Sequence, residues 1–434
     1  MTDLTSRQFV ELIQKSRLVS KDELKAEIDS YKSQNDGKIP KLAEKFVQHM
    51  IANGKLTEWQ YDKLKTGRYK GFFLGKYRLR SHLGSGGMSS VYLADHTVMN
   101  RQVAIKVLPK KRIDDKSYLE RFYLEAQAVA RLDHPNIVRA FDVDADGDTH
   151  YLVMEYVPGA DLSKVVAQSE RHLHFGDAAN YIAQAARGLQ HAHDAELIHR
   201  DVKPANLLVA TDGTVKLLDL GLALFTAKED GSLTEKHDET VLGTADYLAP
   251  EQAISSHHVD SRADVYGLGC TLYFALVGQA PFAEGTLAQR IAAHQSVPAK
   301  SVRESRPDCP EELADICLKM MAKSPDDRFQ RIGDVAEELD RWRKSAKLAV
   351  PAPAEMPVIV TTTSDSAVSS STSDSNIKPG DAAVVDLSLN VGPDSGTKKR
   401  RTRTAAKKPP VFLWLSLAVL TIVAAVLGYL FTQR

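Results

Sequence analysis

The sequence predicts an α+β protein whose main domain is preceded by a small helical region and followed by a disordered linker and one transmembrane helix. Three observations support this prediction. Strand-like segments recur between residues 77 and 157, apolar residues follow helical spacing from Phe175 onward, and the composition changes abruptly at residue 346. Lysine plus arginine and aspartate plus glutamate both total 56, so the charge balance gives no indication of a nucleic-acid partner.

The cysteines and the N-terminus both favour the cytoplasm. Cys270, Cys309 and Cys317 form no Cys-x-x-Cys pair and are odd in number, as is usual where thiols stay reduced. The first residues lack the basic and then apolar pattern of a signal peptide. We therefore expect no export of the bulk of the chain.

Residues 1–70 are predicted to form helices. Ser20-Lys21-Asp22-Glu23 has the pattern of a helix capping box, and Thr57-Glu58-Trp59-Gln60 repeats it 37 residues later. Two degenerate helix–turn–helix copies are plausible, although a solenoid needs more than two. A docking or self-association module and a packing extension of the next domain explain this region equally well.

A glycine-rich turn follows the strand-like segment that begins at Tyr77. Glycine lets the backbone approach phosphates closely and turn its N–H groups toward them. The candidate phosphate-binding residues are Leu83, Gly84, Ser85, Gly86, Gly87, Met88, Ser89, Ser90 and Val91. Lys106 then ends the apolar segment Val103-Ala104-Ile105-Lys106, and a buried lysine requires a partner. Glu125, on the next predicted helix, is the candidate partner.

The stretch from His199 to Asn206, with Asp219 thirteen residues further on, has the residue types that phosphoryl transfer requires. This chemistry needs a carboxylate to orient and deprotonate a hydroxyl, a cation for the moving phosphoryl group, and oxygen ligands for Mg²⁺. Asp201 offers the carboxylate and Lys203 the cation. Asn206 and Asp219 offer the metal ligands.

In this order the motifs resemble those of eukaryotic-like Ser/Thr protein kinases of prokaryotes. The glycine-rich turn resembles G-x-G-x-x-G-x-V, with Ser89 in place of the third glycine, and Val103 to Lys106 matches V-A-I-K. His199 to Asn206 matches H-R-D-x-x-x-x-N, and Asp219-Leu220-Gly221 resembles D-F-G with leucine in place of phenylalanine. The resemblance implies a two-lobed protein kinase fold over residues 77–342.

The resemblance also implies roles for the nucleotide-binding hinge. Met154 is expected to border the pocket, and the backbone at Glu155 and Val157 is expected to meet adenine. Asp161 either contacts ribose or caps the next helix.

Further roles are implied for the helical lobe. Asp264 is expected to hold the catalytic-loop backbone, and Arg328 to pair with Glu251. Arg200 is a natural receiver for a phosphate on the activation segment, which spans Asp219 to Glu251. The candidate phosphorylation sites are Thr240, Thr234 and Ser232. Lys203 and Thr244 together favour Ser/Thr acceptors over tyrosine.

The C-terminal part is predicted to be a tether and an anchor. Residues 346–410 are rich in Pro, Ala, Ser, Thr and Asp and end in a basic cluster, so we expect a disordered linker. Residues 411–431 carry no charge, and as a helix they would span roughly 31 Å, which matches a bilayer core. The basic cluster predicts that the kinase domain is cytoplasmic and that the C-terminus lies on the far side of the membrane.

The sequence thus predicts a membrane-anchored, single-pass Ser/Thr protein kinase that uses ATP and Mg²⁺, with Mn²⁺ as a substitute. Its expected partners are protein substrates and, through a homodimer, a second copy for trans-autophosphorylation. No nucleic acid is expected. The alternative is a membrane-tethered pseudokinase or nucleotide-sensing scaffold, although pseudokinases usually lose a lysine or aspartate that is present here.

Overall fold

The computed structural model describes residues 4–86, 89–108, 116–169, 171–220, 245–254 and 259–347, all within one compact unit that spans residues 1–388. Most of the predicted linker and the predicted transmembrane segment 411–431 lie outside the described residues. Within the ranges that are described, no helix is both long enough and apolar enough to cross a bilayer.

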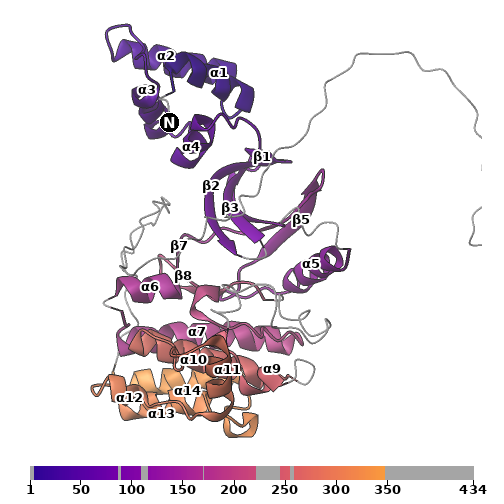
Figure 1. The fold of residues 1–434 in the computed structure, drawn as a ribbon, viewed down its shortest axis with the longest axis vertical. Coiled ribbons are helices and arrows are strands. Elements are labelled where there is room, and N and C mark those ends of the chain that lie inside the picture. Colours follow the sequence, from indigo (N-terminus) through magenta and orange to yellow (C-terminus); the bar gives the residue numbers. More distant parts are fainter. Residues whose placement is uncertain are drawn as a thin grey trace, which may run out of the picture. The chain divides into compact units, whose positions relative to one another are not determined.

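Four helices form the N-terminal region (Figure 1). They are α1 (Ser6–Ser16), α2 (Lys21–Ser33), α3 (Glu44–Ala52) and α4 (Glu58–Lys65). Both predicted capping boxes are confirmed, from Ser20 to Glu23 and from Thr57 to Gln60, and a third from Thr5 to Gln8 begins α1. The helices bury a shared apolar cluster, which explains why such short elements are stable together. This cluster includes Phe9, Ile13, Leu24, Phe46, Met50 and Leu64.

A six-stranded antiparallel sheet follows, in the order β1-β2-β3-β4-β6-β5. Its strands are β1 (Phe73–Leu74), β2 (Tyr77–Gly86), β3 (Ser89–His96), β4 (Arg101–Val107), β5 (Ala140–Asp146) and β6 (Thr149–Glu155). Helix α5 (Lys116–Val129) packs against β5. The register of β2 against β3 shifts twice, between Leu79 and Ser81 and between His82 and Gly84. Such bulges bend a strand and re-aim the residues beyond them.

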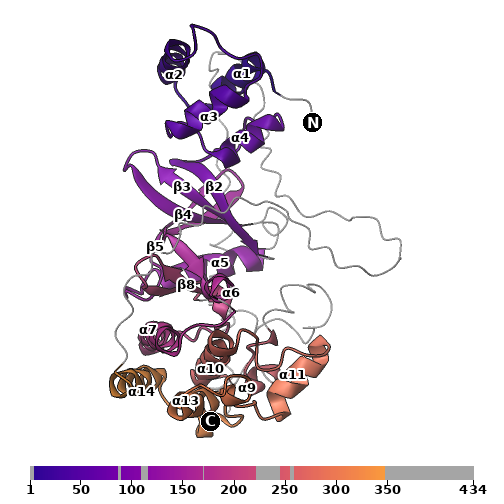
Figure 2. The same cartoon turned by 90° about the vertical axis from the view of Figure 1, so that its left-hand side faces the viewer.

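A three-stranded sheet and a group of helices form the second lobe (Figure 2). The sheet consists of β7 (Gly159–Asp161), β8 (Leu207–Ala210) and β9 (Val215–Leu217). The predicted long helix is confirmed as α7 (Phe175–Asp194), and it packs against α10 (Arg262–Val277). Nearly all of α10 is buried on every side, as expected for a helix in the centre of a core.

The remaining elements complete this lobe. They are α6 (Leu162–Gln168), η2 (Pro204–Asn206), α9 (Pro250–Ile254), α11 (Leu287–Ser296), α12 (Val302–Ser305), α13 (Glu311–Met320), η6 (Pro325–Asp327) and α14 (Ile332–Ser345). Helix α14 packs against α7, and α13 packs against α10. Because these helices share one apolar core, the loop that precedes η2 is attached to a rigid base.

Candidate active site

The loop from His199 to Asn206 is held in place by hydrogen bonds to Asp264, which lies in the first turn of α10. One carboxylate oxygen of Asp264 accepts the N–H of Arg200 at 2.7 Å, and the other accepts the N–H of His199 at 2.9 Å. His193 Nε2 lies 2.7 Å from the second oxygen. Burial tends to raise the pKa of Asp264, but the hydrogen bond and charge of His193, together with the charge and N–H of His199, lower the pKa overall. The predicted structural role of Asp264 therefore has direct geometric support.

His199 links this loop to the residues that precede Asp219. Its Nδ1 accepts the N–H of Asp201 at 3.3 Å, so Nε2 is free to donate to the carbonyl of Leu218, 3.0 Å away. The side chain is fully buried. The structure thus gives both His193 and His199 a positioning role. Their spacing relative to Asp264 is not a local sequence signal, and only the fold brings the three together.

Three candidate residues of the loop contact one another. Lys203 Nζ lies 2.8 Å from Asp201 Oδ2, and Asn206 Nδ2 donates to the carbonyl and to Oδ2 of Asp201 at 2.8 and 3.1 Å. The backbone of Asn206 accepts the N–H of Leu218 at 2.9 Å, which places Asn206 next to the segment that carries Asp219. The four predicted residues are therefore brought together by η2 and the end of β9.

Lys106, from the six-stranded sheet, reaches this cluster. Its Nζ lies 2.7 Å from Asp219 Oδ1, and the lysine side chain is only 6% exposed. Burial tends to raise the pKa of Asp219, but the charge and hydrogen bond of Lys106, with the charges of His199 and Lys203, lower it overall. The carboxylate therefore stays ionised at neutral pH. Glu125 lies on α5, and its side chain is outside the described part, so its pairing with Lys106 stays a prediction.

The glycine-rich turn joins β2 and β3. Leu83 to Gly86 end β2, and Ser89 to Val91 begin β3, while Gly87 and Met88 lie outside the described residues. Ser85 Oγ lies 3.1 Å from Ser90 Oγ, so the two sides of the turn are joined by their hydroxyls. Lys106 pairs in register with Val91 across the β3–β4 ladder. The turn and the lysine therefore border the same space.

The predicted hinge lies at the end of β6. The N–H of Glu155 donates to the carbonyl of Arg139 at 2.9 Å, and its carboxylate accepts Lys216 Nζ at 3.0 Å. Val157 follows β6 in a non-strand segment that enters β7. Asp161 accepts the N–H of Lys164 at 3.1 Å and so caps α6.

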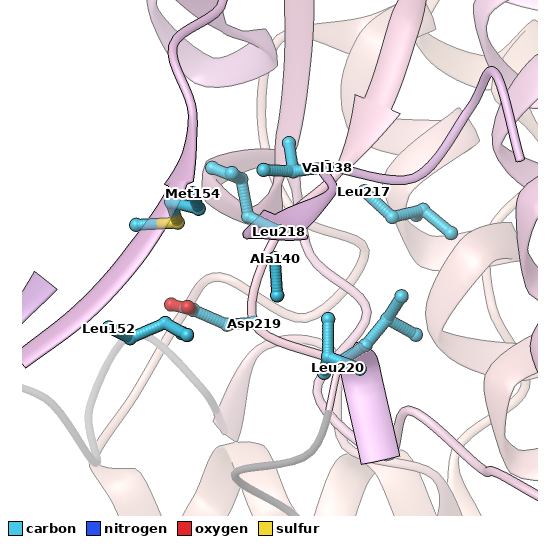
Figure 3. Close-up of a pocket in the computed structure, with 9 residues that line it drawn as sticks. Val138, Ala140, Leu152, Met154, Leu217, Leu218, Asp219 and Leu220 are labelled. Carbon is cyan, nitrogen blue, oxygen red and sulfur yellow. The ribbon is translucent and has the colours of Figure 1, made fainter. Parts of the chain in front are cut away.

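A small apolar pocket extends behind Met154 toward Asp219 (Figure 3). Its lining residues are Val129, Val138, Ala140, Leu152, Met154, Leu217, Leu218, Asp219 and Leu220. Leu220, which replaces the usual phenylalanine of the motif, is 3% exposed and forms part of this lining. Met154 lines this pocket together with Asp219, and its role beside the nucleotide stays a prediction.

The predicted pair between Arg328 and Glu251 is confirmed as a two-pronged contact, at 2.7 and 2.8 Å. The candidate phosphorylation sites and Thr244 fall within residues 221–244, which are not described. Just beyond them, Gln252 Nε2 donates to the carbonyl of Arg200 at 2.8 Å, which ties α9 to the catalytic loop. No local pattern in the sequence predicts this contact.

The donor set fits Mg²⁺. Asn206 and Asp219 offer an amide oxygen and a carboxylate, which are hard oxygen ligands, and Mg²⁺ usually needs only one or two protein ligands besides phosphates and waters. No group of three or more His, Cys, Asp or Glu side chains suitable for a metal occurs among the described residues. Asn206 and Asp219 are suited to hold a metal whose remaining ligands are phosphate oxygens and waters.

Comparison with known proteins agrees with this geometry. The chain is 36% identical over 266 residues to "Serine/threonine-protein kinase PrkC" of Bacillus subtilis, which covers 61% of this chain and 40% of the relative. It is 40% identical over 272 residues to "Serine/threonine-protein kinase PknB" of Mycolicibacterium smegmatis, covering 61% of this chain and 43% of that one. The chain thus spans less than half the length of these curated relatives.

A crystal structure of the Mycobacterium tuberculosis PknI kinase domain aligns with 62% of this chain and 98% of its own, at 27% identity and a TM-score of 0.49. The model of the family described as "Protein kinase domain" matches residues 77–339, which is more than half of the 434 residues. The chain belongs to the protein kinase family.

Proposed function

We propose that this protein is an ATP-dependent serine/threonine protein kinase, which transfers the γ-phosphoryl group of ATP to hydroxyl groups of proteins. The observation that supports this best is the contact cluster of Asp201, Lys203 and Asn206 beside Asp219, which Lys106 reaches from the other lobe. Both relatives named above carry "serine/threonine-protein kinase" in their names. The acceptor class is therefore proposed to be Ser/Thr.

In this mechanism Asp201 accepts the proton of the attacking hydroxyl and orients it. Lys203, 2.8 Å from Asp201, stabilises the negative charge that moves with the phosphoryl group. Lys106 exchanges part of its contact with Asp219 for oxygens of the α- and β-phosphates, as expected of the V-A-I-K lysine. Mg²⁺, when held by Asn206 and Asp219, neutralises charge on the phosphates. The ionised carboxylate of Asp219 is suited to bind both the ammonium group of Lys106 and Mg²⁺.

The test uses the full-length protein, labelled ATP with Mg²⁺ and a generic basic protein, followed by phosphoamino-acid analysis. We expect label on serine and threonine, and a fall in rate of roughly 10²- to 10⁴-fold for Asp201→Asn. Asp308→Asn, which changes an exposed carboxylate in the same lobe, is the control and should keep the wild-type rate. Absence of transfer by the wild type, or equal transfer by Asp201→Asn, favours the pseudokinase alternative.

We further propose that the protein phosphorylates itself within residues 221–244 and is anchored in a membrane by residues 411–431. The first proposal is supported by the position of Arg200 beside Asp201, since arginine binds phosphate strongly. The second is supported by the uncharged composition of residues 411–431 and the basic cluster before them. Phosphate mapping by mass spectrometry tests the first. Loss of the protein from the membrane fraction on deletion of 411–431 tests the second.

A further inference from the structure

The capping box of α4 bonds to the strand that leads into the glycine-rich turn. Thr57 Oγ1 donates to the carbonyl of Arg80 at 2.6 Å, and Gln60 Nε2 donates to the carbonyl of Leu79 at 2.7 Å. Gln60 is 1% exposed. The same two side chains also close the helix cap. The N–H of Thr57 donates to Gln60 Oε1, and the N–H of Gln60 donates to Thr57 Oγ1. Each side chain therefore serves the helix and the strand at once.

The two carbonyls lie at the first bulge of β2. In the ladder with β3, Leu79 pairs with Ala94 and the next pair is Ser81 with Leu93, so Arg80 is the extra residue. Strand β1 pairs with β2 only as far as Arg78. Beyond Arg78, the hydrogen-bond donors to this edge of β2 therefore come from α4. A bulge held by these bonds sets the direction of the residues that follow it.

A continuous set of contacts leads from α4 to the turn itself. The ring of Trp59 packs against Tyr92 with centroids 5.8 Å apart, and Tyr92 packs against His82 at 5.2 Å. His82 Nε2 lies 2.8 Å from Ser85 Oγ, within the glycine-rich segment. Helix α4 is thus connected, through Tyr92 and His82, to the turn that is expected to cover ATP.

The first helix provides an internal comparison. Its capping box uses the same residue types, Thr5 and Gln8, with the same two backbone bonds. There the threonine hydroxyl donates to Gln8 Oε1 at 2.8 Å instead of to a strand. The contact with β2 is therefore a property of the α4 box and not of capping boxes in this region generally.

We propose that Thr57 and Gln60 are positioning residues for the ATP site: by fixing the β2 bulge they hold the glycine-rich turn in its binding geometry, so that docking of the N-terminal helices sets the affinity for ATP. This rests on the proposed function only in that ATP is the nucleotide. The N-terminal helices thereby control how tightly ATP binds. A signal that loosens α4 lowers the occupancy of the ATP site.

The test is the double variant Thr57→Asp/Gln60→Glu in the full chain. Aspartate at the N-cap and glutamate three residues later preserve a capping box, but neither side chain can donate to a strand carbonyl. Thr5→Asp/Gln8→Glu makes the same chemical change in α1 and is the matched control. Thr57→Ser keeps the hydroxyl donor and is the conservative rescue. Because Gln60→Glu buries a charge, Thr57→Asp is also measured alone.

We expect the KM for ATP to rise about fivefold in the double variant and about twofold in Thr57→Asp, with kcat within about twofold of wild type. The control and Thr57→Ser should keep the wild-type KM. Hydrogen exchange of the amides of residues 77–86 should accelerate in the double variant and, to a smaller extent, in Thr57→Asp, but not in the control or in Thr57→Ser. An unchanged KM, a fall in kcat alone, or an equal rise in the control overturns the proposal. Calorimetric binding of ATP with Mg²⁺ requires no transfer, so it tests the proposal even if the proposed function fails.

Discussion

Replacement of Asp264 by alanine tests how the catalytic loop is held. Asp264 is 1% exposed and accepts the N–H groups of His199 and Arg200, both of which lose their partner in the variant. An orphaned buried donor costs about 1–3 kcal/mol, so the two together cost about 4 kcal/mol if the loop keeps its place. Arg200 also has a φ of +62°, a conformation that non-glycine residues avoid unless their surroundings hold them there.

The loop can avoid part of this cost only by moving, and a displacement of about 1 Å at a catalytic group costs roughly 100-fold in rate. We therefore expect Asp264→Ala to lower kcat about 100-fold and to lower the free energy of unfolding by about 3 kcal/mol. The KM for ATP should change little, because Lys106 and the glycine-rich turn belong to the other sheet.

The assay combines steady-state kinetics with urea unfolding. Asp260→Ala is the matched control. Asp260 lies just before the same helix, its side chain is 54% exposed, and it pairs with Arg262. The control should keep the wild-type kcat and lose only about 1 kcal/mol of stability, because Asp260 also accepts the N–H of Arg262 at 2.9 Å. If Asp264→Ala retains wild-type kcat, the argument that this carboxylate positions the loop is wrong.

Three further predictions concern stability and are measured by urea unfolding. Glu251→Gln leaves the charge of Arg328, whose side chain is fully buried, without its carboxylate, and should cost about 3 kcal/mol; a loss below about 1 kcal/mol contradicts this. Burial and the charge of Lys323 lower the pKa of His294 from 6.5 to about 4. The folded state therefore resists protonation of His294. Above about pH 6.5 this residue does not lower the free energy of unfolding, but as the pH falls below that value the free energy of unfolding decreases, by about 2 kcal/mol at pH 5. His294→Gln should abolish that part of the pH dependence. Gly278→Ala should cost about 2 kcal/mol or more, because φ is +86° and a Cβ would lie 2.0 Å from the carbonyl of Arg171. Tolerance of alanine there contradicts the observed backbone.

Local signals in the sequence were sufficient to predict the helices that begin with a capping box or have clear apolar spacing. The capping boxes at Ser20 and Thr57 and the long helix from Phe175 are examples. Motif order was sufficient to predict that Asp219 lies close to Lys106, although these two residues are far apart in the chain.

Contacts that depend on tertiary geometry were not predictable from the sequence. A capping box reveals a helix start, but nothing in Thr57 or Gln60 indicates that their second hydrogen bonds go to β2. The bulge at Arg80 has no glycine or proline to mark it. His199 reads as part of a motif, and its bond to the carbonyl of Leu218 exists only because β9 returns beside the loop.

The connection between α4 and the sheet is short, because α4 ends at Lys65 and β1 begins at Phe73. A released α4 therefore stays near its site at an effective concentration of about millimolar. A free peptide with the α4 sequence would have to reach a similar concentration to compete. Regulators that act through this contact must accordingly bind the N-terminal helices themselves and pull them away, since competition from solution is inefficient.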